Sequence, residues 1–560
     1  MALDQKQSPA GFESTRDPIY DRESEKTSKN GSGDLEGHGR RNFEHHGGRI
    51  GPVLKHLRGT TTTDGAGSDS EANILAGQIE AESENAIQYR TCSWQKTAAL
   101  LFSEYICLAI MSFPYSYSVL GLVPGLILTV VIAAFVLYTS LVVWEFCLRH
   151  PEVRDVCDIG QMLFWGKTWA WYATAVMFIL NNTFIQGLHV LVFAKYLNTI
   201  TDHSQCTIVF AVVAAIICWL ASLPRTFSAL ANLATASAFF TFISVLLAAI
   251  FAGIEAHPAG YNPDPNFINP KTGIHGGEPI VTAIPVAGTT FVSGMSAFLN
   301  ISYTFIGQIT IPSFIAEMRE PKDFPKALWA VTIAEVLVFG IIGSVVYAYT
   351  GNQYNTAPAF GSLGNETFKK VSFSFMIPTL IFLGVLYASV SARFVFFRIF
   401  EGTKHKSSHT VVGWASWAGI LAATWVGAFL IAEVIPFFSD LLSVMSSLFD
   451  SFFGFIFWGL AYVRMRRVDG GVTWLSDMSI YGYSMLALNL FIIAIGLFFL
   501  SAGTYASVQS IINSYDAEPT HCLKMAGKHE SHDRQGSKMT KTATPVEKHF
   551  LEQQRRNISL

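Results

Sequence analysis

Eleven apolar runs of about 20 residues follow one another along the middle of the chain. An α-helix rises about 1.5 Å per residue, so a run of this length matches the roughly 30 Å hydrocarbon core of a bilayer. We therefore expect an all-α membrane protein with eleven transmembrane helices. The runs are residues 97–120, 123–147, 169–195, 207–223, 228–254, 286–311, 328–350, 372–397, 411–433, 440–463 and 482–507.

The two ends of the chain are polar, in contrast to its middle. The 560 residues are 51% hydrophobic and 14% charged, and most charges lie in the ends and between the runs. We divide the chain into a disordered cytosolic tail (1–93), a transmembrane domain (94–507) and a polar C-terminal tail (508–560). No short apolar region follows Met1, so a secretory signal is not expected. No basic face or recognition motif favours binding of nucleic acid.

Lysine and arginine are unequally shared between the two sets of connections. With a cytosolic N-terminus, the inner connections and their flanks hold fourteen and the outer ones four. This bias predicts that the N-terminus is cytosolic, and an odd number of spans then places the C-terminal tail outside. The sequon Asn365-Glu366-Thr367 falls on the predicted outer side, where glycosylation occurs. Cys206 and Cys522 could both face outward, although spacing cannot establish a disulfide.

Two of the runs are interrupted. The first contains Glu104 and, in mid-span, Pro114, which lacks a backbone donor and favours opening of the helix. The sixth gathers Ser, Asn, Thr, Gly and Gln at its middle and is followed by Pro312. Open backbone is tolerated in a membrane only where protein or a cavity satisfies it. Two broken helices five spans apart predict an inverted repeat of five plus five helices, with a binding site at the midplane.

These interrupted spans carry the motifs that resemble the amino acid/auxin permease family. The motifs are Phe113-Pro114-Tyr115 with Leu120-Gly121-Leu122-Val123-Pro124-Gly125, Asp158-Ile159-Gly160 with Phe164-Trp165-Gly166-Lys167, Tyr303-Thr304-Phe305-Ile306-Gly307-Gln308 with Pro312, and Glu317-Met318-Arg319-Glu320-Pro321-Lys322-Asp323-Phe324-Pro325-Lys326-Ala327-Leu328. The resemblance covers residues 93–507 and is strongest to fungal neutral amino acid permeases of the methyltryptophan-resistance or N-system type. Where that family commonly has Gly-x-Gly in its first helix, this chain has Cys107 and Ala109.

The resemblance implies a LeuT-like fold and proton-coupled symport of neutral, aliphatic and aromatic amino acids across a plasma membrane. A zwitterion needs donors for its carboxylate, which the half-helix after Pro114 would supply, and acceptors for its ammonium group, which opened carbonyls would supply. The residues expected to line the substrate site are Ser112, Phe113, Tyr115, Ser302, Tyr303, Thr304 and Phe305. Each of the three aromatic residues Phe113, Tyr303 and Phe305 could equally be a packing or lipid-facing side chain.

Glu104 is the candidate for proton coupling. A charged side chain at mid-bilayer costs about 2.5 to 3.5 kcal/mol on insertion scales, so its presence points to a polar cavity or a partner. The other interpretation is a gate or packing ion pair near Lys96. Glu335, Glu433 and His189 are weaker candidates, and Asn181 and Asn182 are expected to bond between helices. An inner gate is expected from a group of charged residues that follows the sixth run: Glu317, Arg319 and Asp323.

Enzyme-like strings in the chain do not support catalysis. The segment from Gly160 to Thr168 has five residues between its glycines where a P-loop has four, and it follows no strand. His150 and Asp155 have the spacing of some acyltransferases, but their loop is too short for a catalytic domain. The seven cysteines have neither CxxC nor framework spacing. We expect no enzyme, cofactor or metal site.

Three alternatives remain open from the sequence. The same permease could lie in a vacuolar membrane, or the chain could be a nutrient receptor that transports little. Sodium could replace the proton as the coupling ion, with hydroxyls such as Ser389 and Ser391 among its ligands.

Overall fold

The computed structural model describes residues 92–150, 155–225, 227–268, 275–400 and 409–517, together with Ile50, Val153, Thr403 and His405. Residues 46–560 belong to one compact unit, and all described residues fall within it. Most of the two predicted tails lies outside the described residues, so the disorder of the N-terminal tail stays a prediction.

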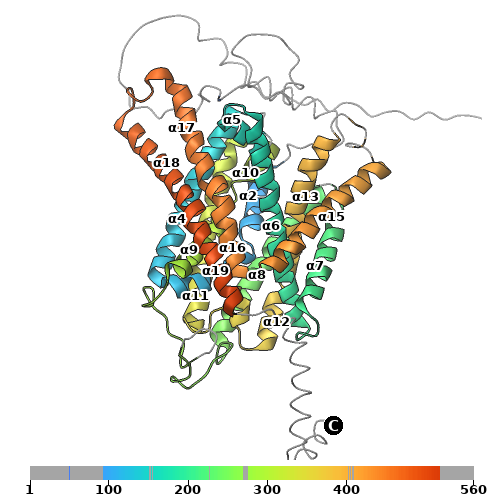
Figure 1. Cartoon of the computed structure of the whole chain (residues 1–560), viewed down its shortest axis with the longest axis vertical. Helices are drawn as coiled ribbons and strands as arrows, with labels where there is room; N and C mark the ends of the chain where they lie inside the picture. Colours follow the sequence, from blue (N-terminus) through green and yellow to red (C-terminus); the bar gives the residue numbers. More distant parts are fainter. Residues whose placement is uncertain are drawn as a thin grey trace, which may run out of the picture. The chain divides into compact units, whose positions relative to one another are not determined.

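The described residues form an all-helical bundle (Figure 1). Nine of its helical spans are long and apolar enough to cross a membrane. The α-helices are α2 (Trp94–Tyr105), α3 (Phe113–Leu120), α4 (Leu122–Arg149), α5 (Val156–Leu163), α6 (Thr168–Ile200), α7 (Thr207–Ser222), α8 (Phe227–Ile254), α9 (Phe291–Phe305), α10 (Ile311–Glu317), α11 (Phe324–Thr350), α12 (Glu366–Ser374), α13 (Ile377–Ile399), α15 (Val411–Val434), α16 (Phe438–Met445), α17 (Phe457–Gly470), α18 (Ile480–Phe498) and α19 (Thr504–Ala517).

Two of the eleven predicted runs are not among these nine spans. The fourth forms α7, which has only 16 residues. The sixth is divided between α9 and α10. Both runs are helical, but the total of eleven crossings and the inverted repeat stay predictions.

The exposed faces of the helices carry apolar side chains, as contact with lipid requires. Ile127 and Val130 on α4 are more than half exposed, whereas Ala133 and Val143 on the same helix are buried. α6 lies among α5, α7, α13 and α15, and its middle is buried. Such a helix needs no polar face, because both its neighbours and the lipid are apolar.

Both predicted interruptions are present, but the first lies earlier in the chain than expected. α2 ends at Tyr105, and Cys107 is extended before a 3₁₀ turn, Leu108–Ser112, leads into α3. Pro114 therefore lies in the first turn of α3 rather than at the open backbone, as Pro312 does in α10. Proline is tolerated in a first turn because the N–H it lacks has no partner there.

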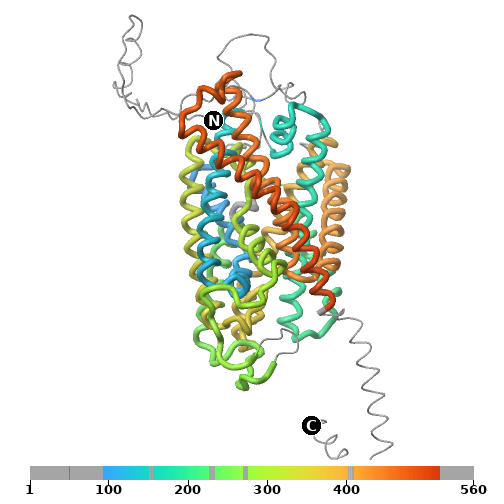
Figure 2. The backbone as a smooth tube through the Cα atoms, turned by 60° about the vertical axis from the view of Figure 1, so that its left-hand side comes forward, coloured from blue at the N-terminus to red at the C-terminus, as the bar shows by residue number. Residues whose placement is uncertain are grey.

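Successive connections lie at opposite ends of the bundle. Figure 1 places α5 and the α17–α18 connection at one end, and α12 at the other. The last helices run obliquely across the bundle between these ends (Figure 2). At the α5 end, Arg149 bonds Glu145 and Asp469, and Arg466 also pairs with Glu145. This network joins the ends of α4 and α17.

The long connection between α8 and α9 packs against the start of α4. Leu122 and Val123 donate backbone hydrogen bonds to the carbonyls of Thr282 and Ala283. Gly121, with φ 80° and ψ 153°, makes this turn, and a Cβ there would lie 2.5 Å from the backbone of Ile284. Only glycine combines this backbone conformation with so close an approach.

Gly121→Ala is expected to lower the stability of the purified protein. A residue forced into this region of φ and ψ costs about 1 to 3 kcal/mol. Gly419→Ala is the matched control, because a Cβ at Gly419 on α15 meets nothing within 4 Å. Thermal unfolding in detergent should show a lower midpoint for Gly121→Ala alone. Equal midpoints for the two variants would refute the steric argument.

The predicted outer residues have well-defined places. Asn365 is exposed and caps α12 by accepting hydrogen bonds from the N–H groups of Thr367 and Phe368. Its Oδ1 does this, so the amide nitrogen that would carry a glycan is not used in the cap. Cys206 is disulfide-bonded, while its proposed partner Cys522 lies outside the described residues.

Glycosylation of Asn365 is testable with two variants. Asn365→Gln removes the acceptor and the cap together, whereas Thr367→Ala removes the sequon and leaves the capping side chain in place. We expect both variants to migrate faster on a gel than the parent protein from a glycosylating host, and glycosidase treatment to abolish the difference. Unchanged mobility of both would mean that this segment carries no glycan.

Candidate functional site

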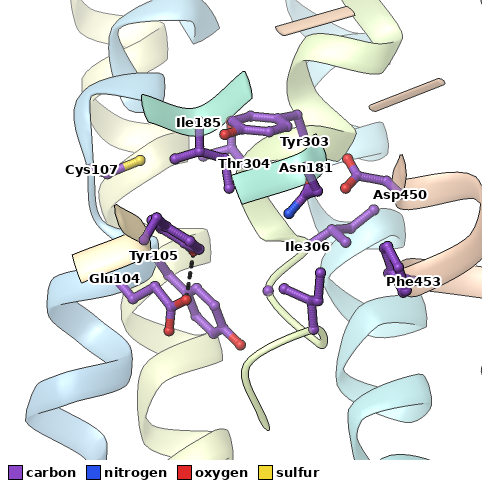
Figure 3. A pocket seen from close by; sticks show the side chains of 13 residues that line it. Glu104, Tyr105, Cys107, Asn181, Ile185, Tyr303, Thr304, Ile306, Asp450 and Phe453 are labelled. Atoms are coloured by element: carbon purple, nitrogen blue, oxygen red, sulfur yellow. Dashed lines mark hydrogen bonds between the residues drawn. The ribbon is translucent and has the colours of Figure 1, made fainter. Parts of the chain in front are cut away.

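A cavity lies where the two interrupted spans face each other (Figure 3). Its walls come from the ends of α2 and α9, from the segment after α9, from α6 and α13, and from a π-helical segment, Ser446–Ile456. The lining contains two carboxylates but no basic side chain. It consists of Glu104, Tyr105, Cys107, Asn181, Ile185, Tyr303, Thr304, Ile306, Gly307, Ile309, Tyr387, Asp450 and Phe453.

The two interruptions touch each other through Tyr105 and Gly307. Tyr105 is the last residue of α2, and its ring packs on Gly307 so closely that a Cβ there would lie 1.8 Å from Tyr105 Cε1. The open segment after α9 is also held by Gln308, which donates to Thr139 of α4 at 2.9 Å. Because α2 and α9 both end inside the bundle, their last carbonyls lack partners within their own helices.

Glu104 joins three spans at the floor of the cavity. The carboxylate is 5% exposed. Its Oε1 accepts a hydrogen bond of 2.6 Å from the Tyr387 hydroxyl of α13, and its Oε2 accepts one of 3.2 Å from the Thr310 hydroxyl just before α10. The alternative of an ion pair with Lys96 is not seen, because both oxygens have these neutral partners.

Asp450 lies across the cavity from Glu104 in Figure 3. It belongs to the π-helical segment Ser446–Ile456 and is 5% exposed. Our sequence analysis missed it, together with Tyr387. The signal was available for Asp450, because an acid in the middle of the run 440–463 is as costly as Glu104.

The seven predicted lining residues separate into three groups. Tyr303 and Thr304 line the cavity. Phe113 and Phe305 instead pack on each other and on Phe339, with ring centroids 5.0 to 6.2 Å apart. The packing interpretation therefore describes these two phenylalanines, which are not part of the cavity lining.

The three remaining predicted residues do not line the cavity. The Ser112 hydroxyl donates to the carbonyl of Ala109 at 2.7 Å. The Ser302 hydroxyl is buried without a hydrogen-bond partner, and Tyr115 is half-buried. A role in binding substrate stays a prediction for all three.

The weaker candidates lie outside the cavity, except one. Asn181 lines the cavity. Asn182 of α6 donates a hydrogen bond to Ser391 of α13 at 3.0 Å, which is a bond between helices as expected. His189 and Glu335 are buried, and Glu433 is half-buried near the end of α15.

Two of the expected gate residues, Glu317 and Arg319, lie beside the start of α2. Backbone hydrogen bonds join Cys92 to Glu317 and Arg319. Asp323 pairs with Lys326 at 2.7 Å, and Glu317 lies within electrostatic range of Arg393. Their gating role stays a prediction.

Comparisons with known proteins cover the whole bundle. A family model described as transmembrane amino acid transporter protein matches residues 90–509. The N amino acid transport system protein of Neurospora crassa is 31% identical over 461 residues, covering 81% of this chain and 93% of that protein. A transmembrane transporter of Gibberella moniliformis is 30% identical, covering 79% and 89%. Among solved structures, MhsT in complex with L-phenylalanine is similar with a TM-score of 0.46 and 13% identity, covering 74% of this chain and 100% of that one.

Gly307→Ala tests the contact between the two interruptions. The added methyl group would displace the Tyr105 ring and reshape the cavity. We expect the initial rate of amino acid uptake, normalised to protein at the membrane, to fall about ten-fold to 100-fold, since small misplacements at a site have effects of this order. Gly294→Ala on α9 is the control, because a Cβ there meets nothing within 4 Å. Equal rates for the two variants would contradict the proposed importance of this contact.

Proposed function

The chain belongs to the transmembrane amino acid transporter family, whose members are transporters and not enzymes, and we propose that it moves neutral amino acids together with protons by alternating access. In this proposal eleven helices, arranged as a five-plus-five inverted repeat with a cytosolic N-terminus, rock around the cavity. The proposed location is the plasma membrane, and the vacuolar membrane is the alternative.

The observation that carries the proposal is the position of Glu104. This buried carboxylate lies between the two open segments and has no basic partner among the described residues. A carboxylate of this kind is costly in its charged form, so it is a suitable group to take up and release a proton as the cavity changes its access.

Thr310 provides a link from that proton to the backbone of the sixth span. Its hydroxyl has one hydrogen but two acceptors within reach, Glu104 Oε2 at 3.2 Å and the Gly307 carbonyl at 2.8 Å. An ionised Glu104 would draw the hydrogen to itself. A protonated Glu104 would donate to Thr310, which would then donate to Gly307. The charge on Glu104 would thus decide how the open segment is bonded.

The walls of the cavity favour a neutral side chain on the substrate. Ile185, Ile306, Ile309 and Phe453 offer apolar contact. An aliphatic or aromatic side chain would bury apolar surface here, at about 25 cal/mol per Å². The α3 N-terminus, which the sequence suggested for the carboxylate of the zwitterion, contributes no residue to the cavity lining, and the N–H of Phe113 already donates to the carbonyl of Ile110.

Uptake measurements test this function directly. Labelled neutral amino acids would be offered to transporter-deficient yeast at pH 5 and pH 7.5, with and without a protonophore. We expect accumulation that is faster at pH 5 and is abolished by the protonophore. Accumulation that depends on a sodium gradient instead would exclude proton coupling, and binding without accumulation would indicate a receptor.

Glu104→Gln should separate transport from coupling. The amide keeps the size of the side chain and cannot release a proton. We therefore expect the variant to exchange labelled for unlabelled amino acid, while accumulation above equilibrium and the difference between pH 5 and pH 7.5 both disappear. Glu433→Gln is the control, because Glu433 is a half-buried acid outside the cavity. If Glu104→Gln retains acid-stimulated accumulation, Glu104 is not the proton carrier.

A further inference from the structure

Asp450 is a second buried acid in the cavity, and it has fewer partners than Glu104. Its Oδ2 is buried without a hydrogen bond of ordinary geometry, although the hydroxyl of Ser446 lies close enough to interact with the carboxylate. By contrast, Tyr387 and Thr310 reach the two oxygens of Glu104. Asp450 therefore keeps more of its capacity to accept hydrogen bonds from a ligand.

The backbone at Asp450 is also unusual. The residue lies in the middle of an 11-residue π-helical segment, Ser446–Ile456. π-Helical turns are rare and occur frequently at functional sites. A buried carboxylate that no cation compensates is destabilising, so a fold retains one where a ligand supplies the missing charge.

The charges of the cavity do not balance without a ligand. Its lining holds Glu104 and Asp450 but no lysine, arginine or histidine. Tyr303 lies within electrostatic range of both acids, so its hydroxyl is affected by two negative groups. Two positive charges are therefore needed to neutralise the cavity when both carboxylates are ionised. A proton can supply one, and a protonated amino group can supply the other.

We propose that Asp450 binds the protonated amino group of the transported amino acid. This inference rests on the proposed function and adds the residue that recognises the ammonium group. Three N–H donors of an ammonium group can bond the Asp450 carboxylate and neighbouring acceptors. Glu335 is also buried with an unpartnered oxygen, but it does not line the cavity. The site thereby requires an α-amino group, and an α-hydroxy acid of the same shape binds weakly.

The test compares ligands with and without that amino group. The full-length protein in detergent would be titrated with L-leucine and L-phenylalanine, and with the α-hydroxy acid of each, at one fixed pH. The protein variants would be Asp450→Asn, Asp450→Glu and a control, Asp440→Asn. Asp440 is a buried acid of the neighbouring helix α16, but both of its oxygens accept hydrogen bonds, from Ser510 and Ser514.

The expected result is a change in the ratio of the two affinities. Asp450→Asn removes a hydrogen bond between two charged groups. The free energy of such a bond corresponds to a loss of about ten-fold to 100-fold in affinity for the amino acid. Binding of the α-hydroxy acid should stay the same or improve, so discrimination between the two is lost. Asp450→Glu should retain discrimination, and Asp440→Asn should leave it unchanged. A general loss of structure would weaken both ligands together and leave the ratio intact.

Three outcomes would overturn the inference, and they differ from one another. Undiminished discrimination by Asp450→Asn, with the affinity for the amino acid also unchanged, would remove Asp450 from recognition while leaving the proposed function in place. A sodium requirement of the parent protein that disappears in Asp450→Asn would assign the carboxylate to a metal cation. A parent protein that binds none of the four compounds would overturn the proposed function, and the inference would fall with it.

Discussion

Backbone polar groups in hydrocarbon have no water to bond with, and this constraint governs where the chain can open. Two spans open, and both do so inside the bundle, where neighbouring helices supply partners. Gln308 reaches α4, and Thr310 bonds back to Gly307 while facing Glu104. The ring of Tyr105 on Gly307 fixes the two openings against each other. A cavity lined by backbone and by acids follows from this meeting of two incomplete helices.

The charges of the described residues differ in kind between the end of the bundle and its interior. At the α5 end, Arg149, Arg466, Glu145 and Asp469 satisfy one another. In the cavity, acids face neutral hydroxyls and apolar walls. Paired charges at an aqueous end hold helices together, whereas unpaired acids in the interior need positive charge from outside the protein. In the mechanism that we propose, this need connects the fold to the transport of protons and ammonium-bearing substrates.

The sequence predicts the membrane spans and both interruptions, because these are properties of continuous stretches of chain. It also identifies Glu104, Tyr303 and Thr304. It misplaces the first opening. Proline is tolerated best in the first turn of a helix, so Pro114 lies after the open backbone and does not mark its position. Asp450 could have been singled out as an acid in the middle of an apolar run, but nothing in such a run indicates which face of its helix meets a cavity. Phe113, Tyr303 and Phe305 are aromatic residues of the two interrupted spans, and which of these rings lines the cavity is decided by packing in three dimensions.

The central claim is that substrate binds between the two interrupted spans, and Cys107 allows the most direct test of it. This thiol lines the cavity at the opening after α2. Uptake would be measured after treatment with a small methanethiosulfonate reagent, with and without excess amino acid, in the parent protein and in Cys107→Ala. The account predicts that the reagent blocks uptake, that amino acid protects against it, and that Cys107→Ala is insensitive. A Cys107 that reacts equally fast whether or not amino acid is present would place the substrate elsewhere.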